Sequence, residues 1–448
     1  MENNTVSDGN LEDEYLYKNR YEIKFDVKET EHLEKEARAS LAKLKKDNLQ
    51  KMRSVKNRAT SMDYFDRFMY DPAERIKEIE ALKKKGTKVI GYFCVMVPEE
   101  IILAAGAVPI RLCGGFFDAI YPAEEFMPKN ICPMVKATFG SWLLDMNPYF
   151  KLCDVVIIPT TCDSKKKLAS ILADFMKVIL LDVPNTKDNP QSDEFWLSQT
   201  KLLTKKMEEL TGNTIRTEKL KQAIETQNQR TKVLRRLMEV RKSQSHVINE
   251  RDFLLAVQTA FYDDPNRWVE KANLLANELA DNLQKGKTIA GPDTCRVMLT
   301  GSPMIWPNFK VLNIVEELSA VHVIDDSCAG VQMMYNPIEV EDWTRKGMMQ
   351  AIAEKAILPC VCPCFSHSDD RIDRILELSA SFRAEGVIYH VLRLCQIYDM
   401  EFLPIEKILN DRNIPLLKIE TDYSEEDVGQ IKTRVEAFLE MLKARRIR

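Results

Sequence analysis

The sequence lacks an apolar run of the ~18 residues that a membrane-spanning helix needs. Its first stretch, MENNTVSDGNLEDEYLYK, lacks the basic start and apolar core of a signal peptide. It also lacks a clustered basic excess, because the net charge is −4 and acids nearly balance bases. We therefore expect a cytoplasmic protein that binds neither a membrane nor nucleic acid.

Short motifs of several common enzyme and metal-site classes are missing as well. There is no Walker A, GxGxxG or nucleophile-elbow motif, which disfavours a standard nucleoside triphosphatase or dinucleotide enzyme. There is no paired CxxC zinc pattern and no CxxCxxC ferredoxin run. The five histidines show no metal-ligand spacing.

Cysteine is abundant, with 11 residues in the chain. Cytoplasmic thiols stay reduced, so these residues are expected to be buried thiols, catalytic thiols or metal ligands rather than disulfides. Many cysteines and few histidines favour soft thiolate ligation of an iron–sulfur cluster. The alternative is that each cysteine is a small core residue, which is the commoner role of a single free cysteine.

The pattern of apolar runs divides the 448 residues into four parts. Residues 1–84 hold a leader and a Lys-, Glu- and Ala-rich helical extension. Residues 85–191 and 289–448 alternate short buried strands with helices, which is typical of parallel sheets covered on both faces. Residues 192–288 show helical stretches without a convincing strand. The predicted fold class is α/β, with two Rossmann-like domains, the N-terminal helical extension and a helical connector.

Five cysteines stand where an expected strand ends. They are Cys94, Cys113, Cys162, Cys328 and Cys395. Because open α/β sheets bind ligands outside the carboxyl ends of their strands, we expect these thiols to converge on one cleft between the two domains. This shared position weakens the alternative that each is only a core residue.

Other candidates stand at expected helix starts and turns. Cys132 begins the helix CPMVKATFG, where the helix dipole favours a thiolate. Glu100 begins another helix, and either compensates the dipole or faces the cleft as an acid/base group. The run CVCPC (360–364) either ligates metal or forms a loop with buried thiols. GSPM (301–304) is either an anion-binding turn or an ordinary tight turn.

Several of these blocks together resemble the 2-hydroxyacyl-CoA dehydratase/benzoyl-CoA reductase family. The resemblance rests on GYFCVMVPEEIILAAGAVPIRLCGG, CPMVKATFG, DVVIIPTTCDSKKK, RVMLTGSPM, DDSCAG and GVIYHVLRLC. It runs from residue 85 to the end of the sequence, except for the helical connector. It implies two Rossmann-like domains that enclose an iron–sulfur cluster.

The resemblance also implies a set of ligands. Simple dehydratase subunits of the family hold one four-iron cube through three cysteines, which makes Cys132, Cys162 and Cys395 the core ligands here. A double-cubane branch holds two cubes joined by a sulfide and needs more thiolates. The additional ligands of that kind are Cys94, Cys113 and Cys328, with Cys362 and Cys364 in reserve. The number of cysteines favours this branch, so the cofactor is a 4Fe-4S or a double-cubane 8Fe-9S cluster. Glu100 is the catalytic candidate.

The function implied by the resemblance is reductive. A separate ATP-hydrolysing 4Fe-4S activator protein would inject one low-potential electron, and a second copy or homologous subunit would complete a dimer. The substrate would be a 2-hydroxyacyl-CoA, dehydrated through a ketyl radical, an aromatic acyl-CoA, or a small molecule. Two alternatives stay open. The chain could be a non-catalytic electron-relay or cluster-carrying subunit, or a metal-free α/β binding protein.

Overall fold

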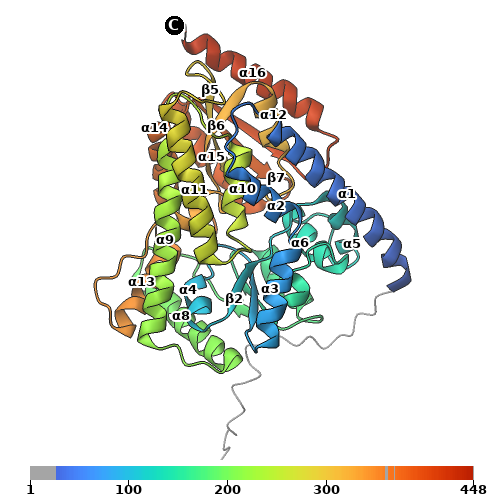
Figure 1. Ribbon diagram of the computed structural model, residues 1–448, viewed down its shortest axis with the longest axis vertical. Coiled ribbons are helices and arrows are strands. Elements are labelled where there is room, and N and C mark those ends of the chain that lie inside the picture. Colours follow the sequence, from blue (N-terminus) through green and yellow to red (C-terminus); the bar gives the residue numbers. More distant parts are fainter. Residues whose placement is uncertain (1–26, 359–361, 368, 447–448) are drawn as a thin grey trace, which may run out of the picture.

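The computed structural model describes residues 27–358, 362–367 and 369–446 (Figure 1). The expected leader and Cys360 of the CVCPC run lie outside these residues. The described part contains two four-stranded parallel sheets, each covered by helices, so the predicted fold class is confirmed.

The first sheet is built from the short apolar runs between residues 89 and 181. Its strands are β1 (Val89–Tyr92), β2 (Val108–Arg111), β3 (Val155–Pro159) and β4 (Val178–Leu181), in the order β2-β1-β3-β4. Its helices are α4 (Glu99–Ala104), η1 (Phe117–Ala119), α5 (Ile120–Ala123), α6 (Pro133–Leu143), η2 (Phe150–Leu152) and α7 (Asp163–Leu172). β1 and β3 are buried throughout, as strands covered on both faces require.

The second sheet repeats this topology. Its strands are β5 (Cys295–Gly301), β6 (Ala320–Asp326), β7 (Gly386–Leu392) and β8 (Leu416–Thr421), in the order β6-β5-β7-β8. Its helices are α12 (Lys310–Glu317), η3 (Val331–Met334), α13 (Arg345–Ile357), α14 (Asp369–Ser381), α15 (Gln396–Asp411) and α16 (Val428–Arg446). In each sheet the chain reverses its direction of winding between the first and third strands, so each sheet has a topological switch point there.

Helices alone form the extension and the connector in the described residues. The extension comprises α1 (Val27–Arg53), α2 (Met62–Tyr70) and α3 (Ala73–Lys84). The connector comprises α8 (Pro190–Thr211), α9 (Thr217–Arg241), α10 (Glu250–Thr259) and α11 (Pro265–Gln284). In Figure 1, α1 runs along one side of the molecule, and α9 runs along the other.

The chain returns to the first domain between β6 and β7. Met348 and Ile352 of α13 share a buried apolar cluster with Ile101 of α4 and Trp196 of α8. The Trp196 indole N–H donates a hydrogen bond of 3.0 Å to the carbonyl oxygen of Ala353. The predicted domain boundaries did not indicate that α13 packs on the first domain. This packing connects the two domains.

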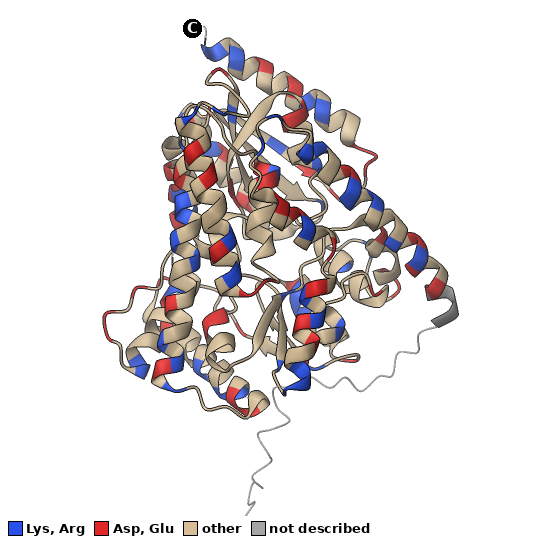
Figure 2. Cartoon of the chain, viewed as in Figure 1, with Lys and Arg blue, Asp and Glu red and all other residues tan. Residues whose placement is uncertain are grey.

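The surface carries both signs of charge. Figure 2 shows Lys and Arg interspersed with Asp and Glu along the long helices, as the balanced composition indicates. Among the described helices, none combines the length and the apolar character needed to cross a membrane.

Gly140 allows α6 to approach the backbone of η1, and alanine there is expected to destabilise the protein. A Cβ atom at residue 140 would lie 1.6 Å from the carbonyl oxygen of Ala119, so the backbone would have to move. We expect Gly140→Ala to lower the free energy of unfolding by about 1–3 kcal/mol or more, measured by urea denaturation. Gly291→Ala is the control, because no heavy atom lies within 4 Å of its added Cβ. Equal stability of the two variants would contradict this packing.

Candidate functional site

Three predicted ligands are N-cap residues of helices. Cys132, Cys162 and Cys395 come immediately before α6, α7 and α15. At a helix N-terminus the free backbone N–H groups and the helix dipole favour an anion, and so favour a thiolate over a thiol. Since α15 belongs to the second domain and the other two helices to the first, thiols from both domains receive this stabilisation.

Cys132 and Cys395 hydrogen-bond to each other across the domain boundary. This bond lowers the pKa of Cys132 to about 7, with help from the backbone N–H groups of Met134 and Val135. The same bond and burial raise the pKa of Cys395 well above its usual value. The charge of Cys162 acts on Cys395, and that of Cys132 on Cys162. All three thiols therefore belong to one electrostatic group.

Cys94 lies at the switch point of the first sheet. It follows β1 by two residues, is 4% exposed and has a φ of +77°. Leu394, which precedes Cys395 at the end of β7, also has a positive φ of +66°. A left-handed backbone is unfavourable for both side chains and is commonest where the surroundings impose it, often at functional sites.

Arg111 joins Cys113 to Cys328. Its guanidinium donates to the Cys328 carbonyl oxygen at 2.7 Å and to the Cys328 sulfur at 3.5 Å, and it also hydrogen-bonds Cys113. It stacks over the Phe261 ring at 4.4 Å and is 1% exposed. Burial alone would raise the pKa of Cys113, but Arg111 and Lys165 outweigh it and lower that pKa. Burial raises the pKa of Cys328 to about 12.

Lys165 is a second cation of the site. It lies in the first turn of α7, and its Nζ donates to the Thr161 hydroxyl at 3.0 Å. Burial opposes its charge, but the thiols around it raise its pKa well above the usual value. These thiols are Cys94, Cys113, Cys162 and Cys362. Within the part of the chain that the structure describes, no carboxylate forms an ion pair with Lys165.

The CVCPC run contributes to the same site. Cys362 is buried and hydrogen-bonds Cys364, which lowers the pKa of Cys362 to about 7. The charge of Cys362 acts on Lys165 and on Cys162. Cys362, named from the sequence only as a reserve, therefore belongs to the same electrostatic group as Cys162 and Lys165, and Cys364 is linked to it by the hydrogen bond.

Two cysteines lie at the opposite ends of the sheets. Cys153 precedes β3, and Cys295 is the first residue of β5. Burial raises the pKa of both thiols, that of Cys295 to about 11. They match the alternative in which a cysteine is a small core residue.

Glu100 and its neighbour Glu99 are both buried at the start of α4. Glu99 accepts hydrogen bonds from Gln227 at 3.0 Å and Arg230 at 2.6 Å, and Arg230 keeps the pKa of Glu99 low despite burial. Glu100 is 1% exposed and pairs with Lys355 at 3.1 Å. The Glu99 contacts support a packing role, and Glu100 remains the predicted acid/base group.

GSPM forms a tight turn whose polar groups bond within the protein. The Ser302 N–H donates to the His390 carbonyl at 2.7 Å, and the Ser302 hydroxyl accepts from the Leu392 N–H at 3.0 Å. Gly301 has a φ of +106°, and a Cβ there would lie 2.1 Å from the same carbonyl. These contacts favour the tight-turn alternative over anion binding.

The thiol set suits a cluster better than a single ion. Among the described residues, no three Cys, His, Asp or Glu side chains surround a common point that could hold a metal ion. In a four-iron cube each thiolate binds a different iron, so the ligands need not surround one point. Soft sulfur donors, helix N-termini and two cations, Arg111 and Lys165, fit an anionic iron–sulfur group. Cys132, Cys162 and Cys395, with the additional thiols, are the residues that could hold it.

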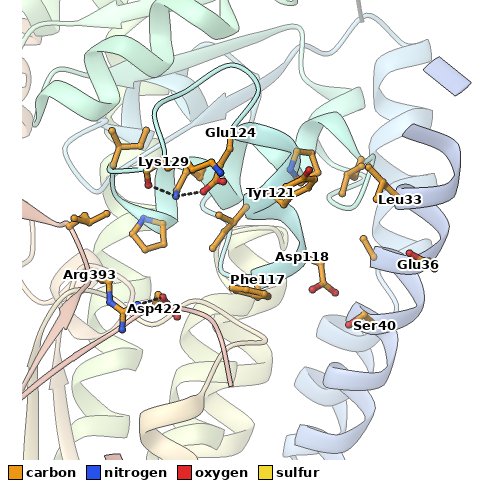
Figure 3. Close-up of a pocket in the computed structure, with 18 residues that line it drawn as sticks. Leu33, Glu36, Ser40, Phe117, Asp118, Tyr121, Glu124, Lys129, Arg393 and Asp422 are labelled. Carbon is orange, nitrogen blue, oxygen red and sulfur yellow. Dashed lines mark hydrogen bonds and ion pairs between the residues drawn. The ribbon is translucent and has the colours of Figure 1, made fainter. Parts of the chain in front are cut away.

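Two cavities adjoin this thiol group, and α1 lines both. The smaller one, of about 100 Å³, is lined by Cys113, Leu41 of α1 and the rings of Tyr149 and Tyr262. The larger one, of about 640 Å³, opens between α1, the segment 117–136 and the loop after β7 (Figure 3). Its walls include Pro133 and Leu394, the neighbours of Cys132 and Cys395. One thiol, that of Cys113, lines the smaller cavity, and the larger cavity is lined by the chain neighbours of Cys132 and Cys395.

Several residues of the site were missed from the sequence. The sequence gave a weak indication for Lys165, because a lysine in the first turn of a helix interacts unfavourably with the helix dipole. For Arg111 the only indication was that a charged residue stands in a predicted buried strand. Tyr398 and Tyr423 are buried near the thiols, and burial together with thiol charges raises the pKa of both phenols.

Comparisons with known proteins agree with this picture. The family model described as "2-hydroxyglutaryl-CoA dehydratase, D-component" matches residues 94–442, a range that begins after α1–α3. YjiM of Escherichia coli (strain K12), which its name describes as a dehydratase subunit, is 30% identical over 84% of this chain and 97% of its own. The (R)-phenyllactyl-CoA dehydratase beta subunit of Clostridium sporogenes is 25% identical over 81% of this chain and 93% of its own length. A benzoyl-CoA reductase subunit of Thauera aromatica is 22% identical over 80% of this chain and 91% of its own length.

Proposed function

Because this chain belongs to the family of the 2-hydroxyglutaryl-CoA dehydratase D-component, we propose that it is the iron–sulfur subunit of a cytoplasmic reductive enzyme. It takes low-potential electrons from an ATP-hydrolysing 4Fe-4S activator protein. It works with a second copy or a homologous subunit. The observation that carries the proposal is the set of cysteine N-caps from both domains, with Cys132 hydrogen-bonded to Cys395.

In this proposal Cys132, Cys162 and Cys395 hold the core of the cluster. The additional thiols of Cys94, Cys113 and Cys328, with Cys362 and Cys364, provide for the double-cubane form. When bound, the cluster supplies low-potential electron transfer to the substrate. The helix N-termini of the chain stabilise thiolates, and Arg111 donates a hydrogen bond to sulfur. The aromatic residues of the smaller cavity limit the access of water to the thiols.

The names of relatives, which describe acyl-CoA dehydratases and an acyl-CoA reductase, support a proposed substrate class. We propose a 2-hydroxyacyl-CoA first, and an aromatic acyl-CoA or a small molecule as the other candidates. The larger cavity beside Pro133 and Leu394 is the proposed route to the thiols.

Anaerobic turnover tests the proposal. The purified protein, with its activator, ATP and a reductant, is offered a 2-hydroxyacyl-CoA and, separately, benzoyl-CoA. Dehydration or ring reduction supports the enzyme. Iron without turnover of any substrate supports the alternative of an electron-relay or cluster-carrying subunit, and absence of iron contradicts both.

Glu100→Gln separates an acid/base role from a packing role. As a general acid or base, Glu100 supplies about 10²–10⁴-fold of the rate, so turnover per iron should fall by that factor at unchanged iron content. Lys355→Met is the companion variant, because it breaks the ion pair but leaves the carboxyl group in place. Wild-type turnover per iron in Glu100→Gln would contradict the catalytic role.

A further inference from the structure

Two cations lie among the thiols of the site, within sequence blocks that carry the family resemblance, but the resemblance assigned no role to either. Arg111 donates to both the carbonyl oxygen and the sulfur of Cys328 and hydrogen-bonds Cys113. Lys165 extends from the first turn of α7, where Thr161 fixes its ammonium group at 3.0 Å. Arg111 is 1% exposed, so its charge is held away from solvent.

The two cations follow different strands of the first sheet, and each of these strands has a counterpart in the second sheet. Arg111 is the last residue of β2, and it bridges Cys113 after β2 to Cys328 after β6. β2 and β6 occupy the same position in their sheets, next to β1 and β5. Lys165 follows β3, whose counterpart β7 precedes Cys395. Arg111 thus hydrogen-bonds the outer pair of strand-end thiols, while the charge of Lys165 acts on thiols of both the outer strands and the switch point.

A buried cation in a protein normally has an acidic partner, because charge is costly to remove from water. Lys165 is partly buried, and in the described part of the chain it has a hydroxyl and thiols as neighbours but no ion-paired carboxylate. At the Cys113–Cys328 pair, the Arg111 guanidinium donates to a sulfur and to a main-chain carbonyl oxygen. Negative charge on sulfur is therefore the natural counter-ion for Lys165, and the same kind of charge lies within reach of Arg111.

We propose that Arg111 and Lys165 are positioning residues that balance the charge of an anionic iron–sulfur group and raise its reduction potential. The proposal rests on the proposed function and adds to it. A fixed positive charge beside a cluster stabilises the reduced form, which carries one more negative charge, and net charge and hydrogen bonds to sulfur are known controls of cluster potential. Removing either cation therefore makes reduction harder.

Lys165→Met is the main test, with Lys165→Arg as the rescue and Lys167→Met as the control. Lys167 belongs to the same helix but is exposed. Each protein is purified anaerobically or reconstituted with iron and sulfide, and its iron content and midpoint potential are measured by an EPR-monitored redox titration. Arg111→Met and Arg111→Lys give an independent second pair.

For Lys165→Met we expect about a tenfold or greater fall in the equilibrium constant for reduction, about 59 mV for one electron. Lys165→Arg restores the wild-type potential, and Lys167→Met leaves it unchanged. If Lys165→Met takes up no iron, restoration of iron by Lys165→Arg supports the proposal, and failure of that rescue overturns it. Wild-type potentials in both Lys165→Met and Arg111→Met overturn it as well. A wild-type protein that takes up no iron would instead refute the proposed function.

Discussion

Serine in place of Cys132, Cys162 or Cys395 is expected to strip iron from the purified protein. Each residue caps a helix that stabilises a thiolate, and the three thiols form one electrostatic group. Loss of a ligand removes a bond to iron, so the affinity should fall by more than the ~10–100-fold typical of losing an outer partner of a ligand. The measurement is iron and sulfide per chain after anaerobic purification.

Cys153→Ser and Cys295→Ser are the matched controls for these variants. Both residues are cysteines of the same two sheets, but they stand where β3 and β5 begin rather than where strands end. They should keep the wild-type iron content. Equal iron in all five variants would contradict the assignment of the core ligands.

The additional cysteines decide which cluster is present. With a double cubane, serine at Cys94, Cys113 or Cys328 should lower the iron content from about eight toward about four per chain. With a single cube, the same variants should keep about four irons per chain. Serine at Cys362 or Cys364 tests in the same way whether the CVCPC run belongs to the ligand set.

Arg58→Met is expected to lower the free energy of unfolding by about 3–5 kcal/mol, the cost of leaving buried charges without their partner. Arg58 pairs at 2.7 Å with both Asp66 of α2 and Asp252 of α10, and these carboxylates are 0% and 2% exposed. The triad attaches the N-terminal extension to the connector. The measurement is urea denaturation of the metal-free protein.

Arg53→Ala is the control for this triad. Arg53 also contacts Asp66, at 2.8 Å, but its side chain is 51% exposed. We therefore expect Arg53→Ala to lower the free energy of unfolding by only about 0–1 kcal/mol. Adding Asp66→Asn and Asp252→Asn to Arg58→Met should recover part of the loss, because the uncompensated charges are removed. A loss in Arg58→Met no larger than in Arg53→Ala would contradict the role of the triad.

Local patterns in the sequence predicted the fold well. The eight strands of the described residues lie within the apolar runs, and burial on both faces explains why the runs of the inner strands β1, β3, β5 and β7 are so uniform. The rule that ligands bind at the carboxyl ends of parallel strands also predicted five strand-end thiols, which stay candidate ligands. Helix-start chemistry identified Cys132, whose position before α6 and lowered pKa agree with that reasoning.

Contacts between distant parts of the chain could not be predicted in the same way. Glu100 pairs with Lys355, which is 255 residues away, and Glu99 pairs with Arg230, which is 131 residues away. Arg111 bonds Cys328 only because the two domains meet. The crossing of α13 to the first domain likewise depends on tertiary packing, which no local periodicity encodes.

The most direct test of the central claim is the iron and sulfide content of the wild-type protein, with its EPR spectrum, after anaerobic purification. If thiolates of both domains share one cluster, the protein should be brown and lose its colour in air. It should hold about four or about eight irons per chain and give an EPR signal when reduced. A colourless protein that holds no iron, even after reconstitution with iron and sulfide, would contradict the account.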